Sequence, residues 1–230
     1  MNEFWHASLF WGCALALATY LLGDFLKRRT KRSWLNPLLF AIVVCVFFLA
    51  AFRIDYEDFQ ASCRPLSYFL TPATVCLAVP LYRQIEMLKR YPLAIAAGIV
   101  CGVLVNLAGV ALLALLFRLD STQFMTLLPK SITTAIGMGL SEELGGIASL
   151  TVALIILTGL TGNLSAALVC RLFRITEPVA KGVAIGTASH AIGTARALEM
   201  GEIEGAVSSL SLALTGLLTV LAAILVFGAV

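Results

Sequence analysis

The chain has 230 residues, of which 60% are hydrophobic and 13% charged, and its formal net charge is +3. A soluble domain is usually about 45–50% apolar and about 25% charged, so this composition excludes an ordinary soluble domain and favours a membrane protein. The basic residues are clustered rather than spread over one face, which argues against a nucleic-acid partner.

The first apolar segment, residues 4–26, is long enough to cross a bilayer, which takes about 20 helical residues. A signal peptide carries its basic residues before its apolar run, whereas here the basic run, residues 27–32, follows it. We therefore expect this segment to stay in the mature protein as a membrane span.

Five further segments are predicted to span the membrane: residues 34–51, 65–82, 92–117, 147–172 and 203–227. The segment 65–82 contains Pro72 and Pro80, and each proline removes a helix hydrogen bond. Such interruptions are tolerated at membrane depth only where protein or a water-filled cavity satisfies the freed carbonyl groups.

Lys and Arg residues predict the orientation, because they are enriched in cytoplasmic loops. The basic run at 27–32 and the basic residues between 83 and 90 then lie inside. Those between 171 and 181 also lie inside, provided that residues 124–143 enter the membrane and return on the outer side. By the same reasoning residues 179–199 enter and return on the inner side. Both termini are then expected to face outward.

A short pattern occurs twice after residue 128. Ala-Ile-Gly at 135–137 returns at 191–193, and Leu-Thr-Gly-Leu at 157–160 returns at 214–217. Because one full span separates the two predicted dips, the copies would enter from opposite faces. Such inverted repeats occur in many secondary transporters, whose binding site lies where the two tips meet. The alternative is a chance similarity between helices of like composition.

The predicted architecture is all-α and polytopic, with about six full transmembrane helices and two re-entrant or broken segments. We expect residues 1–60 to supply scaffold or dimerisation helices. Residues 61–230 would form a transport-like domain with repeats at 129–172 and 184–228, in an elevator-like arrangement.

Polar side chains at membrane depth are candidates for function, because burying them is expensive. The substrate-binding candidates are Lys130, Thr133, Thr134, Ser189, His190, Thr194 and Arg196. Hydroxyl groups and helix N-termini donate hydrogen bonds, and Arg196 or Lys130 supplies positive charge, so the set suits a small organic anion. His190, Glu143 and Glu199 are the candidates for carrying a proton.

Each candidate also has a structural interpretation. Arg196 and Glu199 are three residues apart and would pair at a helix end. His190 would be a packing residue, and Asn106 a hydrogen-bonding contact between helices. The six cysteines form no metal-binding or disulfide pattern, and no catalytic motif occurs. We therefore expect no cofactor, no metal and no enzymatic activity.

Three stretches carry a resemblance to a known family: LTPATVCLAVPLYRQ at 70–84, PKSITTAIGMGLSEELGGIASLT at 129–151 and AIGTASHAIGTARALEMGEIEGAVSSL at 184–210. They resemble the LrgB/CidB family. Bacterial members are holin/antiholin-like modulators of murein hydrolase activity and cell lysis, and they work beside a small LrgA/CidA-type membrane protein. Other members are linked to pyruvate movement, and the plastidic relative is a glycolate/glycerate translocator. The sequence departs from the family at Ala135, where many members carry Pro, and at Gly139, where many carry an acidic residue.

The resemblance implies a multi-pass protein of the bacterial inner membrane. Together with the polar residues it favours a secondary transporter of small monocarboxylates of the glycolate, glycerate, pyruvate or lactate type, expected to be a homodimer, with proton coupling left open. The alternative is a holin/antiholin-like regulator of murein hydrolase activity and lysis that transports nothing itself.

Overall fold

The computed structural model describes residues 10–30, 37–69, 72, 75–76, 78–83 and 85–227. Within these ranges the regular structure is entirely helical. Of the predicted spans, residues 4–9, 34–36 and part of 65–82 lie outside the described residues, as does residue 228 of the second repeat. The chain divides into two compact units, Met1–Cys76 and Leu77–Val230.

The first unit contains four described helices: α2 (Trp11–Thr30), α3 (Pro37–Phe52), α4 (Tyr56–Ser62) and α5 (Arg64–Tyr68). Helix α2 packs against α3 and α4. Against α4, the Cys13 thiol donates a hydrogen bond to the Ser62 carbonyl oxygen over 3.1 Å. The Trp11 and Phe59 rings lie 5.7 Å apart.

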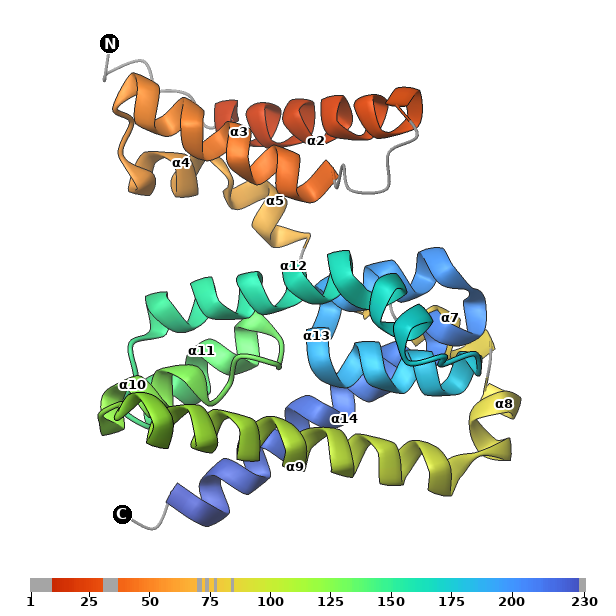
Figure 1. The fold of residues 1–230 in the computed structure, drawn as a ribbon. Coiled ribbons are helices and arrows are strands. Elements are labelled where there is room, and N and C mark those ends of the chain that lie inside the picture. The colour runs from red at the N-terminus through yellow and green to blue at the C-terminus, as the bar shows by residue number, and fades with distance from the viewer. Residues whose placement is uncertain are drawn as a thin grey trace. The chain divides into compact units, whose positions relative to one another are not determined.

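The second unit carries the predicted site. Its helices are α7 (Ala78–Arg83), α8 (Ile85–Arg90), α9 (Pro92–Phe117), α10 (Ser121–Leu127), α11 (Thr134–Glu143), α12 (Ala148–Leu172), α13 (Pro178–Met200) and α14 (Glu202–Phe227). In Figure 1, α9 and α12 run along opposite sides of this unit, with α11 and α13 between them. Helix α13 packs against α9, α12 and α14, whereas α11 packs against α12.

Two interruptions divide the polar part of this unit. Helix α10 ends at Leu127 and α11 begins at Thr134, after the extended N-cap residue Thr133. Helix α13 is interrupted at His190, whose backbone has φ 42° and ψ −140°. Each interrupted segment is followed by one long helix, α12 or α14.

Among the described residues, three helices are long and apolar enough to cross a membrane: α9, α12 and α14. They correspond to the predicted spans at 92–117, 147–172 and 203–227. Helix α3 is apolar but has only 16 residues, and α2 carries Asp24, Lys27 and Arg28 near its end. Six full spans are therefore not confirmed, and the segment 65–82 is not one continuous helix, because α5 ends at Tyr68.

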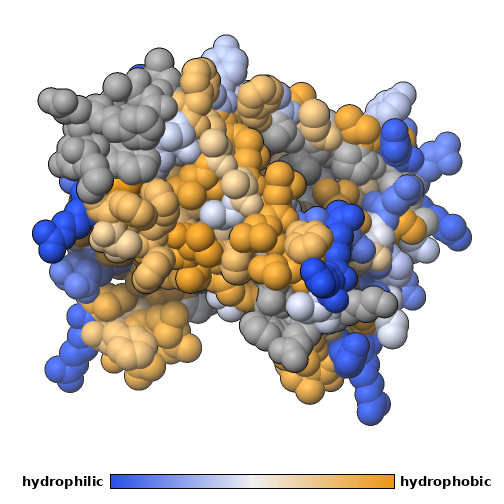
Figure 2. All heavy atoms as spheres, turned by 90° about the horizontal axis from the view of Figure 1, so that it is seen from above, coloured by the Kyte–Doolittle hydropathy of each residue, from blue (hydrophilic) through white to orange (hydrophobic). Residues whose placement is uncertain are grey.

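The outer faces of these helices are apolar. Leu112, Leu115 and Leu116 on α9 are 66%, 78% and 71% exposed, and Leu225 on α14 is 80% exposed. Figure 2 draws another face, the one seen from above in the view of Figure 1, and there too apolar side chains cover a broad area with the most hydrophilic ones near its borders. Large exposed apolar surfaces of this kind are rare on soluble monomers and are expected where lipid is the solvent.

Helices α13 and α14 approach each other closely through two glycines four residues apart. A Cβ atom at Gly186 would lie 2.5 Å from the Ser208 carbonyl oxygen, and one at Gly182 would lie 2.8 Å from the Glu204 carbonyl oxygen. Small residues at this spacing let helix backbones pack directly in membrane proteins. The contact holds the polar face of α14 against the interruption in α13.

Candidate functional site

The interruption in α13 is a buried polar cluster. His190 is 2% exposed, and its Nε2 lies 2.9 Å from the Ile155 carbonyl oxygen of α12. Because a carbonyl oxygen only accepts, Nε2 carries the proton in this contact. Thr194 donates to the His190 carbonyl oxygen over 2.8 Å, and its hydroxyl lies 2.8 Å from that of Ser208 on α14. The predicted residues His190 and Thr194 are thus brought together, and each has a partner within the protein.

Two glycines of α12 leave room for this interruption. A Cβ atom at Gly159 would lie 2.7 Å from Cε1 of the His190 ring, and one at Gly162 would overlap the Ser189 side chain. Asn163, on the same helix, donates to the Ile192 carbonyl oxygen over 2.9 Å. Helix α12 therefore provides space for the interruption and a hydrogen bond to the backbone beside it.

A second polar cluster lies in the turn before α11. Lys130 Nζ donates to Asn106 Oδ1 over 2.7 Å and to Ser131 Oγ over 3.2 Å. Ser131 Oγ in turn donates to Asn106 Oδ1 over 2.9 Å. The predicted residues Thr133 and Thr134 follow as the N-cap and first residue of α11, and the Thr133 side chain makes no capping hydrogen bond. Asn106 thus joins α9 to the turn before α11 rather than to another helix, and it holds the predicted ligand Lys130.

Both clusters lie against the same stretch of α9. A Cβ atom at Gly102 would lie 3.0 Å from Thr187 Oγ1, just before the interruption in α13. One helical turn further, Asn106 binds the turn before α11. The two tips that the sequence singles out are therefore anchored about one turn apart on a single helix.

The two copies of the repeated pattern also contact each other reciprocally. A Cβ atom at Gly159 would lie 2.9 Å from Ile192 Cβ, and one at Gly216 would lie 3.2 Å from Ile136 Cδ1. Gly159 and Gly216 occupy the same position of the repeat, as do Ile136 and Ile192. The long helix of each copy thus packs on the tip of the other.

Arg196 lies apart from the buried clusters. Its Nη1 is 2.6 Å from Oε2 of Glu199, and the two side chains are 30% and 54% exposed. The pairing at a helix end, one of the two interpretations of these residues, is therefore the observed geometry. Glu143 is exposed at the end of α11, where it lines a cavity of about 1030 Å³ together with Asp120.

We predict that Arg196→Ala lowers the free energy of unfolding by less than about 1 kcal/mol, because partly exposed ion pairs contribute little. Thermal unfolding of the purified protein in detergent measures this effect, with Arg28→Ala, at the Asp24–Arg28 pair of α2, as the control. A much larger loss would mean that Arg196 is needed for folding and that its variants cannot report on a ligand.

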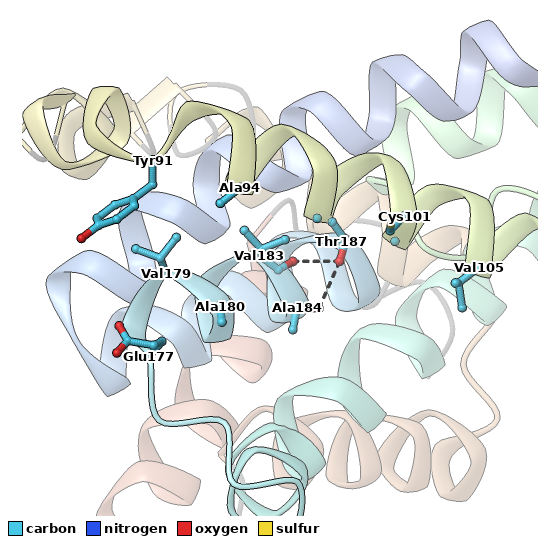
Figure 3. A pocket seen from close by; sticks show the side chains of 12 residues that line it. Tyr91, Ala94, Cys101, Val105, Glu177, Val179, Ala180, Val183, Ala184 and Thr187 are labelled. Atoms are coloured by element: carbon cyan, nitrogen blue, oxygen red, sulfur yellow. Dashed lines mark hydrogen bonds between the residues drawn. The ribbon is translucent and has the colours of Figure 1, made fainter.

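Figure 3 shows a different kind of cavity, a groove of about 790 Å³ between α9 and α13. Its walls are small and apolar, with Tyr91 and Glu177 at one end. The hydroxyl of Thr187 is already used, since it donates to the Val183 carbonyl oxygen over 2.8 Å. None of the predicted site residues lines this groove, and its lining suits an apolar occupant rather than an anion.

Comparison with known proteins gives the chain its family. Residues 16–229 match the model of the LrgB-like family. The chain belongs to the LrgB family. The antiholin-like protein LrgB of Bacillus subtilis (strain 168) is 37% identical over 215 residues, which cover 93% of each chain. That of Bacillus mycoides (strain KBAB4) is 35% identical over 212 residues, 92% of each. No solved structure matches the chain.

Membership of the LrgB family and the three long apolar helices make this chain a membrane protein. Within it, sequence reasoning missed the hydroxyl-bearing face of α14. Ser208, Ser211, Thr215 and Thr219 are all buried there, at 0%, 0%, 1% and 0% exposure. The signal was present in the sequence, because spacings of three and four residues place them on one helical face.

Proposed function

We propose that this LrgB-family protein is an antiholin-like regulator that restrains murein hydrolase activity and cell lysis. The observation that carries the proposal is the set of relatives, which share the name antiholin-like protein LrgB and align over nine-tenths of the chain. A restraining role in the membrane works through contacts with other membrane proteins. The exposed apolar faces of α9 and α14 support such contacts, with a second copy or with a small LrgA/CidA-type protein.

A bacterial strain without its own LrgB-type protein tests this proposal. Expression of the chain is expected to lower murein hydrolase activity in cell extracts and to slow detergent-induced lysis, compared with the empty vector. The control is a chain of equal abundance with an unrelated membrane sequence, so that membrane loading is matched. Unchanged hydrolase activity and lysis at full expression would refute the regulatory role.

We propose transport of a small monocarboxylate as a second candidate function. What supports it is the pair of buried polar interruptions anchored one turn apart on α9. Interrupted helices at membrane depth are typical of transporters, in which they line the substrate site. The reciprocal packing of Gly159 on Ile192 and of Gly216 on Ile136 further supports an inverted repeat of the elevator type.

Uptake by proteoliposomes of the purified chain tests the second candidate. Labelled glycolate, pyruvate and lactate are each offered at a range of concentrations, and transport predicts saturable uptake that empty liposomes lack. If a proton accompanies the anion, uptake rises as the external pH falls. Uptake that grows linearly with concentration would exclude a carrier and leave the regulatory role standing.

A further inference from the structure

The amide group of Asn106 has a fixed orientation and, among the described residues, one unpartnered end. Its Oδ1 accepts from both Lys130 Nζ and Ser131 Oγ, and an ammonium group can only donate. The oxygen is therefore identified by its partners, and the other atom is the amide nitrogen. That Nδ2 is buried and finds no hydrogen-bond partner among the described residues.

Lys130 adds an uncompensated positive charge beside this amide. An ammonium group has three N–H donors, and two of them are used by Asn106 and Ser131. Both partners are neutral, and no carboxylate within the described part of the chain pairs with Lys130. A half-buried charge without a counter-charge is unfavourable, so an anion bound beside Lys130 would relieve this cost.

Within the described chain, helix α14 carries two more unpartnered hydroxyls, and the residues that follow Thr219 pack near the turn that carries Lys130. The hydroxyls of Thr215 and Thr219 are buried without a partner in the described chain. Neighbouring hydroxyls behave differently, since Ser209 and Ser211 each donate to the carbonyl oxygen four residues earlier. Val220 and Ala223, which follow Thr219, pack in one apolar cluster with Leu107, Leu128 and Ile132. These three residues immediately follow Asn106 or flank the turn that carries Lys130.

From these open groups we infer an anion site that takes the carboxylate of a small organic anion, with Lys130 Nζ and Asn106 Nδ2 as its ligands and Thr219 as a further donor. The inference rests on the second candidate function and names the part of the chain that would hold its substrate. The open groups of Lys130 and Asn106 can only donate, and the net charge is positive, so the missing partner is a negatively charged acceptor rather than a metal ion. Two N–H donors from different elements suit the two oxygens of a carboxylate.

Binding to the purified full-length protein in detergent tests the site, with glycolate as the probe and glycolamide as its uncharged counterpart. Titration calorimetry and the rise in the thermal unfolding midpoint are both recorded. Glycolate is expected to bind and stabilise, whereas glycolamide is not. Stronger binding of inorganic phosphate than of glycolate would overturn the carboxylate assignment.

Two variants change the charge of the site in different ways, one by removing the positive charge and one by adding a negative charge. Lys130→Met removes the charge and is expected to abolish glycolate binding. Asn106→Asp places a carboxylate beside Lys130, so it should weaken glycolate binding at least about tenfold while leaving the unfolding midpoint unchanged or higher. Because Asn106→Asp is expected to fold well, it still tests the site if Lys130→Met does not fold.

Thr219→Val removes an unpartnered hydroxyl with little change of shape. It is expected to weaken glycolate binding without lowering the unfolding midpoint. The matched control is Thr161→Val, at an exposed residue of α12, which should leave binding unchanged.

Glycolate affinity that is the same in wild type, Asn106→Asp and Thr219→Val would overturn the site. The two proposals fail separately. Saturable uptake that is unchanged by Asn106→Asp would leave transport standing and refute the site. Binding that is lost in Asn106→Asp, in a protein without uptake, would leave the site standing and refute transport.

Discussion

Gly186→Ala is expected to lower the free energy of unfolding by about 1–3 kcal/mol, the usual effect of overfilling a packed contact. The added methyl group would lie 2.5 Å from the Ser208 carbonyl oxygen and 2.7 Å from Ser211 Cβ. A side chain could turn away, but the nearest atom belongs to the backbone of α14. The clash is therefore relieved only if α13 and α14 move apart, which also strains the hydrogen bond between the Thr194 and Ser208 hydroxyls. Thermal unfolding in detergent, followed by circular dichroism, measures the change.

The matched control is Gly109→Ala on α9, where an added Cβ atom meets nothing within 4 Å. Alanine has the higher helix propensity, so this variant should be as stable as the wild type or more so, by up to about 1 kcal/mol. Equal stability of the Gly186 and Gly109 variants would mean that α13 and α14 do not touch through their backbones. The double variant Gly182→Ala/Gly186→Ala should be less stable than either single variant.

The long apolar helices could be predicted from the sequence because their signal is local. Helices α9, α12 and α14 each carry an apolar run that is long enough to cross the bilayer, and this length alone predicts a membrane span. The first unit was predicted less well. Helix α2 has a charged end, and the prolines in 65–82 do not tell where one helix stops and the next begins. The proposed functional boundary near residue 60 stays a prediction, while the compact units divide at residue 76.

In the candidate site, the polar residues can be recognised from the local sequence, whereas their partners lie far away along the chain. The polar residues 130–134 and 187–196 stand out in the sequence because their surroundings are apolar. Their partners do not, since Asn106 lies 24 residues before Lys130 and Ile155 lies 35 residues before His190. Which polar groups are satisfied and which stay open therefore becomes visible only in the folded chain. Arg196 illustrates the difference, because its partner Glu199 is local and was anticipated.

The place of the interruption in α13 was also not predictable. The segment Ser189-His190-Ala191 contains neither glycine nor proline, the residues that usually mark a break. Tertiary contacts fix it instead, through the space at Gly159 and the Ile155 carbonyl oxygen that His190 reaches. The left-handed backbone at His190 is therefore imposed by its neighbours, at a cost of about 1–3 kcal/mol for a residue with a side chain.

In a regular helix a variant with alanine is more stable than one with glycine. The strain at residue 190 predicts the reverse order of stability there. Both His190→Gly and His190→Ala lose the ring and its hydrogen bond to Ile155, so both should be less stable than the wild type. Because both variants lack the ring, the difference between their stabilities reports the strain of the backbone alone. Inside a regular helix glycine is less stable than alanine by about 1 kcal/mol. At φ 42° and ψ −140° glycine is relaxed and alanine is strained, so His190→Gly should be the more stable of the two, by about 1 kcal/mol.

The control lies five residues away in the same helix. Ala195 is exposed and helical, so Ala195→Gly should show the ordinary order and lose about 1 kcal/mol. Thermal unfolding of the three variants in one detergent gives all the comparisons needed. If His190→Ala proves more stable than His190→Gly, residue 190 is helical and α13 is continuous. The polar groups of Ser189 and Thr194 would then have no interrupted backbone to line, and the argument for transport would lose its main support.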